Sequence, residues 1–222
     1  MWRDAAVVGG KDIRIEIQSR VATMQVAPYA VLVLLLFGFA FDQNHTLLTQ
    51  AAPGLFWVAV LLCTLLAVQR SYAIEAADGA RDGLRLSGLD PAGIFLGKAA
   101  AVTAQLLALE VILGVGIVVL FGTSLHDPVL LLASAGAATI GLAASGTVYG
   151  MIASGLRVRE TLLPLLILPV VAPVLLAATQ CWMVALGTSQ TDGWKWMSLL
   201  GAFGAIYVAL GILTFSTLVE ET

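Results

Sequence analysis

Long apolar runs, almost free of charged side chains, constrain this chain more than any other feature of its sequence. A helix needs about 20 apolar residues to cross the roughly 30 Å of hydrocarbon in a bilayer. Because backbone polar groups in lipid must be hydrogen-bonded within the segment, each run of this length is predicted to be a transmembrane helix. The six predicted spans cover residues 21–41, 51–68, 99–121, 128–155, 161–186 and 196–218.

The composition excludes a soluble globular protein. Hydrophobic residues make up 59% of the 222 residues and charged residues only 11%, whereas a soluble domain carries about 25% charged residues. The segments between the spans are short, so residues 1–222 are predicted to form a single transmembrane domain. No cleavable signal peptide is expected, because a polar stretch follows Met1. Cys63 and Cys181 are expected to be membrane-embedded thiols.

Positively charged residues set the predicted orientation, since they gather in cytoplasmic loops. With six spans and a cytoplasmic N-terminus, only Lys195 among the 11 basic residues lies on the outer side. The reverse topology would place all the others outside, so both termini are predicted to be cytoplasmic. The basic residues on the cytoplasmic side are Arg3, Lys11, Arg14, Arg20, Arg70, Arg81, Arg85, Lys98, Arg157 and Arg159.

The longest cytoplasmic segment, residues 69–98, mixes acidic, basic and apolar side chains and then turns at Gly88-Leu89-Asp90-Pro91. Leucines within such a charged segment favour a docking surface for a soluble partner. A loop that merely links two spans is the alternative. The candidate docking residues are Glu75, Arg81, Asp82, Leu84, Arg85, Leu86 and Leu89.

Residues 11–20 alternate apolar and charged side chains, which by period alone indicates a β-strand. A lone strand beside a membrane would leave its edges unpaired, so a short helix in the cytoplasmic interface is predicted instead. Lys11, Arg14 and Arg20 would then point toward the lipid headgroups. A solvated tail is the alternative.

Glu110 is the one carboxylate inside the third predicted span. A charged carboxylate at a helix centre costs about 2.5–3.5 kcal/mol on insertion scales, so it should face other helices or water. Two interpretations are equally open: a polar point on a substrate path, or a protonated side chain bonded to a neighbouring helix.

The fourth and fifth spans carry helix-shaping residues. Gly146 and Gly150 form a G-x-x-x-G pair, which favours close helix packing within one subunit. Three prolines within ten residues predict a bent or broken fifth helix, and a moving part of a transport path is the preferred interpretation. The residues assigned to that path or its gate, besides Glu110, are Pro164, Pro169, Pro173, Gln180 and Trp182.

No sequence pattern indicates an enzyme. The nearest approach to a phosphate-binding loop ends at Gly97-Lys98, but alanine replaces both its first glycine and its hydroxyl residue. No metal site is predicted. His45 and His126 belong to predicted outer loops, where solvation is favoured over ligation of a metal or haem iron. Tryptophans near span ends are expected to be interfacial anchors; they are Trp57, Trp182, Trp194 and Trp196.

Four stretches carry a resemblance to a known family. They are Lys-Asp-x-Arg-x-Glu-x-x-Ser-Arg at residues 11–20, Gln-Arg-Ser-Tyr-Ala-Ile-Glu at 69–75, Asp-Gly-Leu-Arg-Leu-Ser-Gly-Leu-Asp at 82–90 and Ile-Phe-Leu-Gly-Lys at 94–98. Together they are similar to the haem exporter protein B (CcmB) family, and the resemblance extends over nearly the whole chain. It departs at Ala76-Ala77, where family members often carry an asparagine or a second acidic residue.

The resemblance implies an all-α polytopic membrane protein, an ABC-2-like permease with six transmembrane helices, an N-terminal interfacial helix and a cytoplasmic coupling helix around Arg81 to Leu89. It implies the permease subunit of the cytochrome c maturation ABC transporter in the bacterial inner membrane. Two permease copies would bind an ATPase (CcmA-like) that holds the ATP. The other implied partners are a haem-handling membrane subunit (CcmC-like), a small membrane subunit (CcmD-like) and a haem chaperone (CcmE-like), with no nucleic acid.

In such a complex, haem would be the transported or partner-bound species, with no tight haem site in this subunit. ATP hydrolysis would drive either haem export or release of the loaded chaperone. Two other functions stay open on the residues alone: a stand-alone ion-coupled carrier or channel that uses Glu110, and an ABC permease for a lipid or drug.

Overall fold

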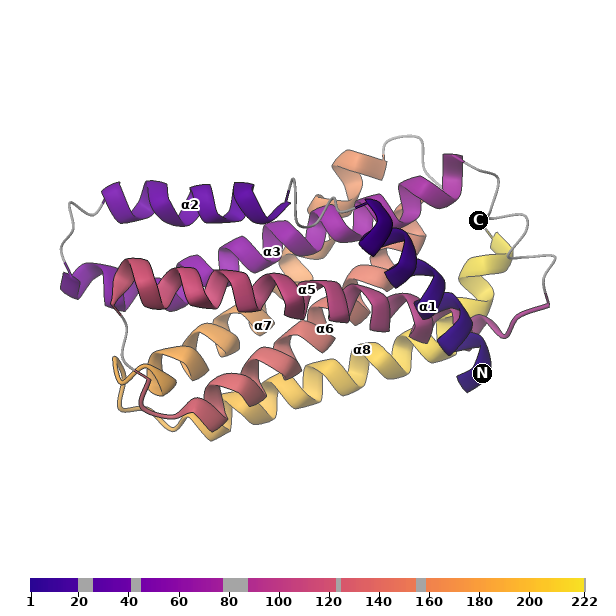
Figure 1. Ribbon diagram of the computed structural model, residues 1–222. Helices are drawn as coiled ribbons and strands as arrows, with labels where there is room; N and C mark the ends of the chain where they lie inside the picture. The colour runs from indigo at the N-terminus through magenta and orange to yellow at the C-terminus, as the bar shows by residue number, and fades with distance from the viewer. Residues whose placement is uncertain (20–25, 41–44, 78–87, 123–124, 155–158, 222) are drawn as a thin grey trace.

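The computed structural model describes residues 1–19, 26–40, 45–77, 88–122, 125–154 and 159–221. All regular structure within these ranges is helical, which agrees with the predicted all-α class (Figure 1). The seven helices of the described part are α1 (Trp2–Ser19), α2 (Ala27–Ala40), α3 (His45–Ala77), α5 (Pro91–Phe121), α6 (Pro128–Ser154), α7 (Arg159–Ala185) and α8 (Gly193–Glu221).

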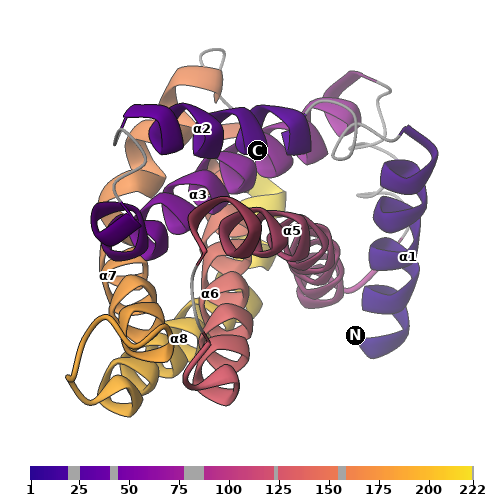
Figure 2. The same ribbon diagram turned by 60° about the vertical axis from the view of Figure 1, so that its left-hand side comes forward.

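The five long helices run side by side in alternating directions, and the two ends of the chain lie at the same end of the bundle (Figure 1). That end, called the α1 end below, also contains the last turn of α3 and the first turn of α5. Helix α1 stands beside the first turns of α5 (Figure 2). Helix α6 is the centre of the bundle, since it packs against α3, α5, α7 and α8.

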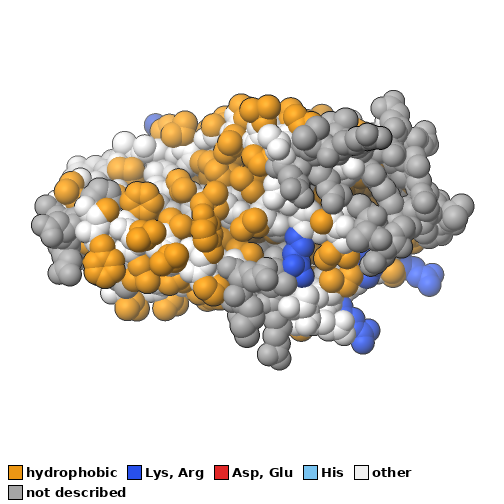
Figure 3. Space-filling view, turned by 90° about the horizontal axis from the view of Figure 1, so that it is seen from above, with side chains coloured by type: hydrophobic (Ala, Val, Ile, Leu, Met, Phe, Trp, Pro, Cys, Tyr) orange, Lys and Arg blue, Asp and Glu red, His pale blue; other side chains and the backbone are white. Residues whose placement is uncertain are grey.

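Five helices, α3, α5, α6, α7 and α8, are long and apolar enough to cross a membrane. They correspond to five of the six predicted spans and support a multi-pass membrane protein. Apolar side chains cover much of the described surface, whereas most of the visible Lys and Arg side chains gather toward the α1 end (Figure 3). A membrane-facing surface has this character, because lipid replaces water around the spans.

The first predicted span, residues 21–41, is only partly within the described residues. Its described helix, α2, is mainly apolar and has 14 residues, which make about 21 Å at 1.5 Å per residue. That length falls short of the roughly 30 Å of hydrocarbon. The sixth membrane crossing therefore stays a prediction.

The ends of two spans differ from the prediction. Helix α3 has 33 residues and continues from the membrane span through Ala77, and α5 begins at Pro91 rather than near residue 99. The start of α5 is set locally: Pro91 occupies the first turn, and the Asp90 side chain accepts a hydrogen bond from the N–H of Ala92 at 3.0 Å. Much of the predicted cytoplasmic segment 69–98 is thus a helical extension of the spans.

Helix α7 is uninterrupted from Arg159 to Ala185, although it contains three prolines. A break in the fifth span is therefore excluded. Pro169 and Pro173 lie on the exposed face of the helix, together with Leu165 and Leu176. Proline has no backbone N–H, so the carbonyl group one turn before each of them lacks its usual helical hydrogen bond. On the exposed face of the helix, neighbouring turns adjust to this more easily than in the packed interior.

Candidate functional site

Helix α1 is held against α5 by a contact between glycines at the α1 end. A Cβ atom added to Gly97 would lie 2.7 Å from the carbonyl oxygen of Ala5 and 2.9 Å from the backbone nitrogen of Gly9. A Cβ added to Gly93 would lie 2.8 Å from the carbonyl oxygen of Met1. Only glycine allows the two backbones to approach this closely. Gly93 and Gly97 form a G-x-x-x-G pair that the sequence analysis did not single out.

Polar contacts fix the start of both helices. The Asp4 carboxylate accepts a hydrogen bond from the N-terminal ammonium at 3.1 Å and from the Asp90 N–H at 3.4 Å. The ammonium also lies 3.3 Å from the Asp90 carboxylate. The hydrogen bond to Asp4 is the main cause of the raised pKa of the ammonium, and the same bond lowers the pKa of Asp4. Both groups are therefore charged at neutral pH.

Lys98 of α5 is a buried cation shared by three helices. Only 3% of its side chain is exposed, and its Nζ lies 3.5 Å from Asp12 Oδ2 of α1. The same nitrogen donates to Ser71 Oγ of α3 at 3.3 Å and stands 4.9 Å from the centre of the Tyr72 ring. A buried charge needs such partners, because it has lost its water. The Lys98 cluster, defined as Asp12, Ser71, Tyr72 and Lys98, therefore joins α1, α3 and α5.

The cluster extends into the central helix through Tyr72. Its hydroxyl donates a hydrogen bond to the carbonyl oxygen of Thr147 in α6 at 2.8 Å. The predicted packing glycines lie nearby: a Cβ on Gly150 would overlap the Tyr72 ring, and one on Gly146 would lie 2.8 Å from Val68. This pair thus faces α3 of the same chain.

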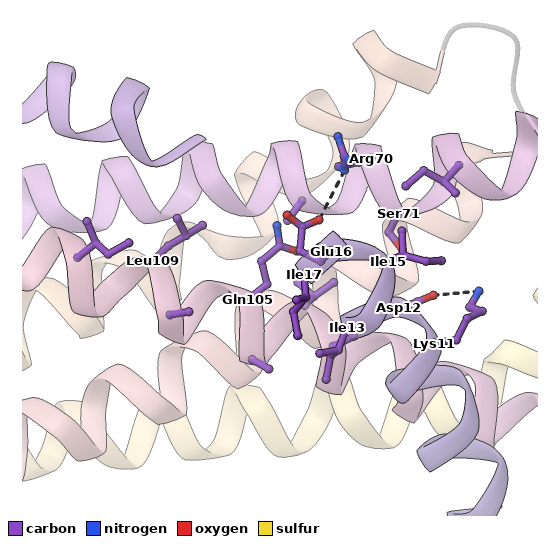
Figure 4. Close-up of a pocket in the computed structure, with 17 residues that line it drawn as sticks. Lys11, Asp12, Ile13, Ile15, Glu16, Ile17, Arg70, Ser71, Gln105 and Leu109 are labelled. Atoms are coloured by element: carbon purple, nitrogen blue, oxygen red, sulfur yellow. Dashed lines mark ion pairs between the residues drawn. The ribbon is translucent and has the colours of Figure 1, made fainter. Parts of the chain in front are cut away.

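A second ion pair and a cavity complete the site. Arg70 Nε of α3 lies 3.5 Å from Glu16 Oε2 of α1. Beside this pair, α1, α3 and α5 line a partly open cavity of about 550 Å³ (Figure 4). Its wall is mainly apolar, and Gln105 lies along it, while Lys11, Asp12, Glu16, Arg70 and Ser71 line its polar end.

The predicted docking residues are only partly within the described structure. Leu89 is half-buried just before α5, and Glu75 lies in the last turn of α3 with its side chain outside the description. For the interfacial helix, Lys11 and Arg14 are exposed on α1, whose helical form agrees with the prediction. The residues that lie outside the described ranges are Arg20, Arg81, Asp82, Leu84, Arg85 and Leu86.

Glu110 lies deep in the bundle, far along α5 from the Lys98 cluster. It is 6% exposed and hydrogen-bonded to the Thr139 hydroxyl of α6. That hydroxyl also bonds to the carbonyl oxygen of Ala135 at 2.7 Å. Thr139 is the donor in both contacts, but a hydroxyl has a single hydrogen; a protonated Glu110 that donates to Thr139 would leave that hydrogen for the Ala135 carbonyl. No partner is recorded in the described part for its second oxygen.

Replacing Glu110 by Gln is therefore expected to leave stability and activity close to wild type, because the amide also donates to Thr139. Replacing it by Ala removes that donor and should destabilise the protein by about 1–3 kcal/mol. Denaturation in detergent and activity of both variants in cells test this. An inactive but fully folded Glu110→Gln protein would instead indicate an ionisable group on a transport path.

The other residues assigned to a path or gate are not brought together around Glu110. Trp182 of α7 stacks on Phe56 of α3 with ring centres 3.9 Å apart, and Trp57 lies 5.6 Å from Trp182. Both indoles are buried, so the expectation that they anchor the membrane interface is wrong. Trp194 is more than half exposed, Trp196 is intermediate, and Gln180 and Pro164 are half-buried.

The described residues contain no group of three or more His, Cys, Asp or Glu side chains that could hold a metal ion. His126 is exposed, and its backbone N–H donates to the Ala185 carbonyl at 2.9 Å. The side chain of His45 lies outside the description. Cys63 and Cys181 are buried free thiols, as expected.

Comparison with known proteins agrees with the resemblance in the sequence. The family described as CcmB protein matches residues 4–221. A heme exporter protein B from Paracoccus denitrificans is 31% identical over 82% of this chain and 83% of its own length. Proteins of the same description from Haemophilus influenzae and Pseudomonas aeruginosa are 29% and 31% identical over 86% and 78% of this chain, with equal shares of their own lengths. The chain therefore belongs to the CcmB protein family.

Proposed function

We propose that this chain is the membrane permease subunit of an ABC transporter that serves cytochrome c maturation. A separate CcmA-like ATPase would bind two copies of it on the cytoplasmic side of the bacterial inner membrane. CcmC-like and CcmD-like membrane subunits and a CcmE-like haem chaperone would complete the assembly. ATP hydrolysis would drive haem export or release of the haem-loaded chaperone. The family match over residues 4–221 carries this proposal.

The arrangement of the α1 end supports the coupling step. Residues 78–87, which include most of the predicted docking residues, connect the end of α3 to the start of α5. The Lys98 cluster ties these two helices to α1, and Tyr72 ties them to α6. A displacement applied by an ATPase to the connection would thus move α1, α3 and α5 together rather than bend one helix.

Haem is proposed as the species that is transported or held by a partner. The test is deletion of the gene, followed by complementation and an assay for c-type cytochromes with covalently bound haem. Loss of these cytochromes in the deletion strain and recovery with the intact gene are expected. Normal cytochromes in the deletion strain would favour a permease for a lipid or a drug.

Charge reversal in the connection tests the docking surface. Arg81→Glu combined with Arg85→Glu is expected to abolish co-purification of the ATPase, because breaking a buried interface charge pair costs about 2–5 kcal/mol. Such a loss weakens binding at least about tenfold per pair. Lys195→Glu is the matched control, since Lys195 is 82% exposed at the opposite end of the bundle. Equal co-purification with both variants would reject the proposed surface.

A further inference from the structure

The cavity between α1, α3 and α5 has the form of a lateral slot rather than an internal chamber. Its α5 wall extends from Ala101 to Ile112, a length of about 16 Å at 1.5 Å per residue. This stretch lies inside the predicted span 99–121, in the half nearer the α1 end. Ala104, Ala108 and Ile112 are exposed, so the slot opens sideways where hydrocarbon is expected.

The chemistry of the slot changes along its length. The deeper wall is mainly aliphatic side chains of α5, with Gln105 among them, whereas the end beneath α1 carries the ion pairs Lys11–Asp12 and Arg70–Glu16 beside isoleucines of α1. Figure 4 shows Lys11, Asp12, Glu16 and Arg70 around that end, Gln105 next to Glu16 in this view, and Leu109 farther along α5. An apolar channel with a charged mouth fits a ligand with an apolar tail and a polar head.

The size of the slot suits a slender ligand such as an acyl chain. Its α5 wall is about 16 Å long and its volume is about 550 Å³. Haem fits the lining poorly, because its iron needs an axial ligand. The described lining residues include no His, Cys, Met or Tyr.

We propose that this slot retains one phospholipid of the leaflet at the α1 end, with an acyl chain along α5 and its phosphate at Arg70 and Lys11. The lipid would fill the space between α1 and the bundle. In the dry interior of a membrane the packing of apolar groups without voids stabilises an assembly. The proposal depends on the membrane embedding and not on the transported substrate.

Blocking the slot tests the proposal. The full-length protein, purified in a mild detergent and washed extensively, is examined by native mass spectrometry. The wild type is expected to retain a single phospholipid, and Ala104→Trp should reduce its occupancy several-fold. Ala205→Trp is the matched control, because Ala205 is exposed on α8, away from the slot. A wild type without phospholipid, or full occupancy in a folded Ala104→Trp protein, would overturn the proposal.

A second measurement requires no variant. Wild-type protein stripped of lipid should regain thermal stability when palmitoyl-oleoyl phosphatidylglycerol is added. Dihexanoyl phosphatidylglycerol, which has the same headgroup and short chains, should not restore it, and neither should haemin. Equal recovery with the short-chain lipid would show that only the headgroup binds, and recovery with haemin alone would show a haem site; either result contradicts the proposal.

Discussion

Substitution of Gly97 by Leu is expected to separate α1 from α5 and to abolish activity. Glycine is less favourable than alanine in a helix by about 0.8–1 kcal/mol, and leucine ranks close to alanine, so α5 itself should not be weakened. The loss comes from packing: even a Cβ at this position would lie 2.7 Å from the Ala5 carbonyl. Overpacking of this kind costs about 1–3 kcal/mol or more, and here α1 can relieve it by moving away.

The measurements are protease cleavage of α1 in membrane vesicles and the yield of c-type cytochromes. Gly114→Leu is the matched control on the same helix, because an added Cβ there meets nothing within 4 Å. Cleavage of α1 should increase only in the Gly97 variant. If both variants behave like the wild type, the glycine contact does not hold α1 in place.

Substitution of Lys98 by Met is expected to be strongly destabilising. It removes the charge near Asp12 and leaves the carboxylate in a site where it is mostly buried. Removal of one partner of a buried ion pair costs about 3–5 kcal/mol. The loss should fall toward the lower end of that range, since Lys11 lies 2.9 Å from the other oxygen of Asp12.

The double variant Lys98→Met with Asp12→Asn separates charge from packing. Replacing both partners of a buried pair is often nearly neutral, so the second change should restore much of the stability lost in the first. Ser71→Ala removes only one hydrogen bond and should cost about 1 kcal/mol. Thermal denaturation in detergent compares the variants. A double variant as unstable as Lys98→Met alone would show that Lys98 acts through packing.

The membrane spans could be predicted because hydropathy is a local property. The runs at 128–155 and 161–186 agree with α6 and α7 within a few residues. Helices also continue where the sequence turns polar, as in α3, which extends past Gln69 to Ala77. A hydropathy pattern cannot show such extensions, because a polar helix outside the lipid has no apolar signal.

The contacts at the α1 end could not be predicted, because they join residues far apart in sequence. The sequence indicates Lys98 as a cytoplasmic cation at the end of an incomplete phosphate-binding loop, yet it is buried between three helices. The Gly93–Gly97 spacing can be read from the sequence. However, G-x-x-x-G pairs are common, and the motif alone does not identify the helix that packs against it. Trp57 and Trp182 were misjudged since tryptophan suits both the interface and the packed interior.

The two buried indoles should differ from the exposed tryptophans in their fluorescence. Two of its five tryptophans, Trp57 and Trp182, are shielded between α3 and α7, and neither indole N–H has a hydrogen-bond partner in the described part. Trp2 and Trp194 are mostly exposed. Indoles away from water emit at shorter wavelengths and resist aqueous quenchers. Fluorescence left after quenching therefore reports mainly on the contact between α3 and α7, with a contribution from the half-buried Trp196.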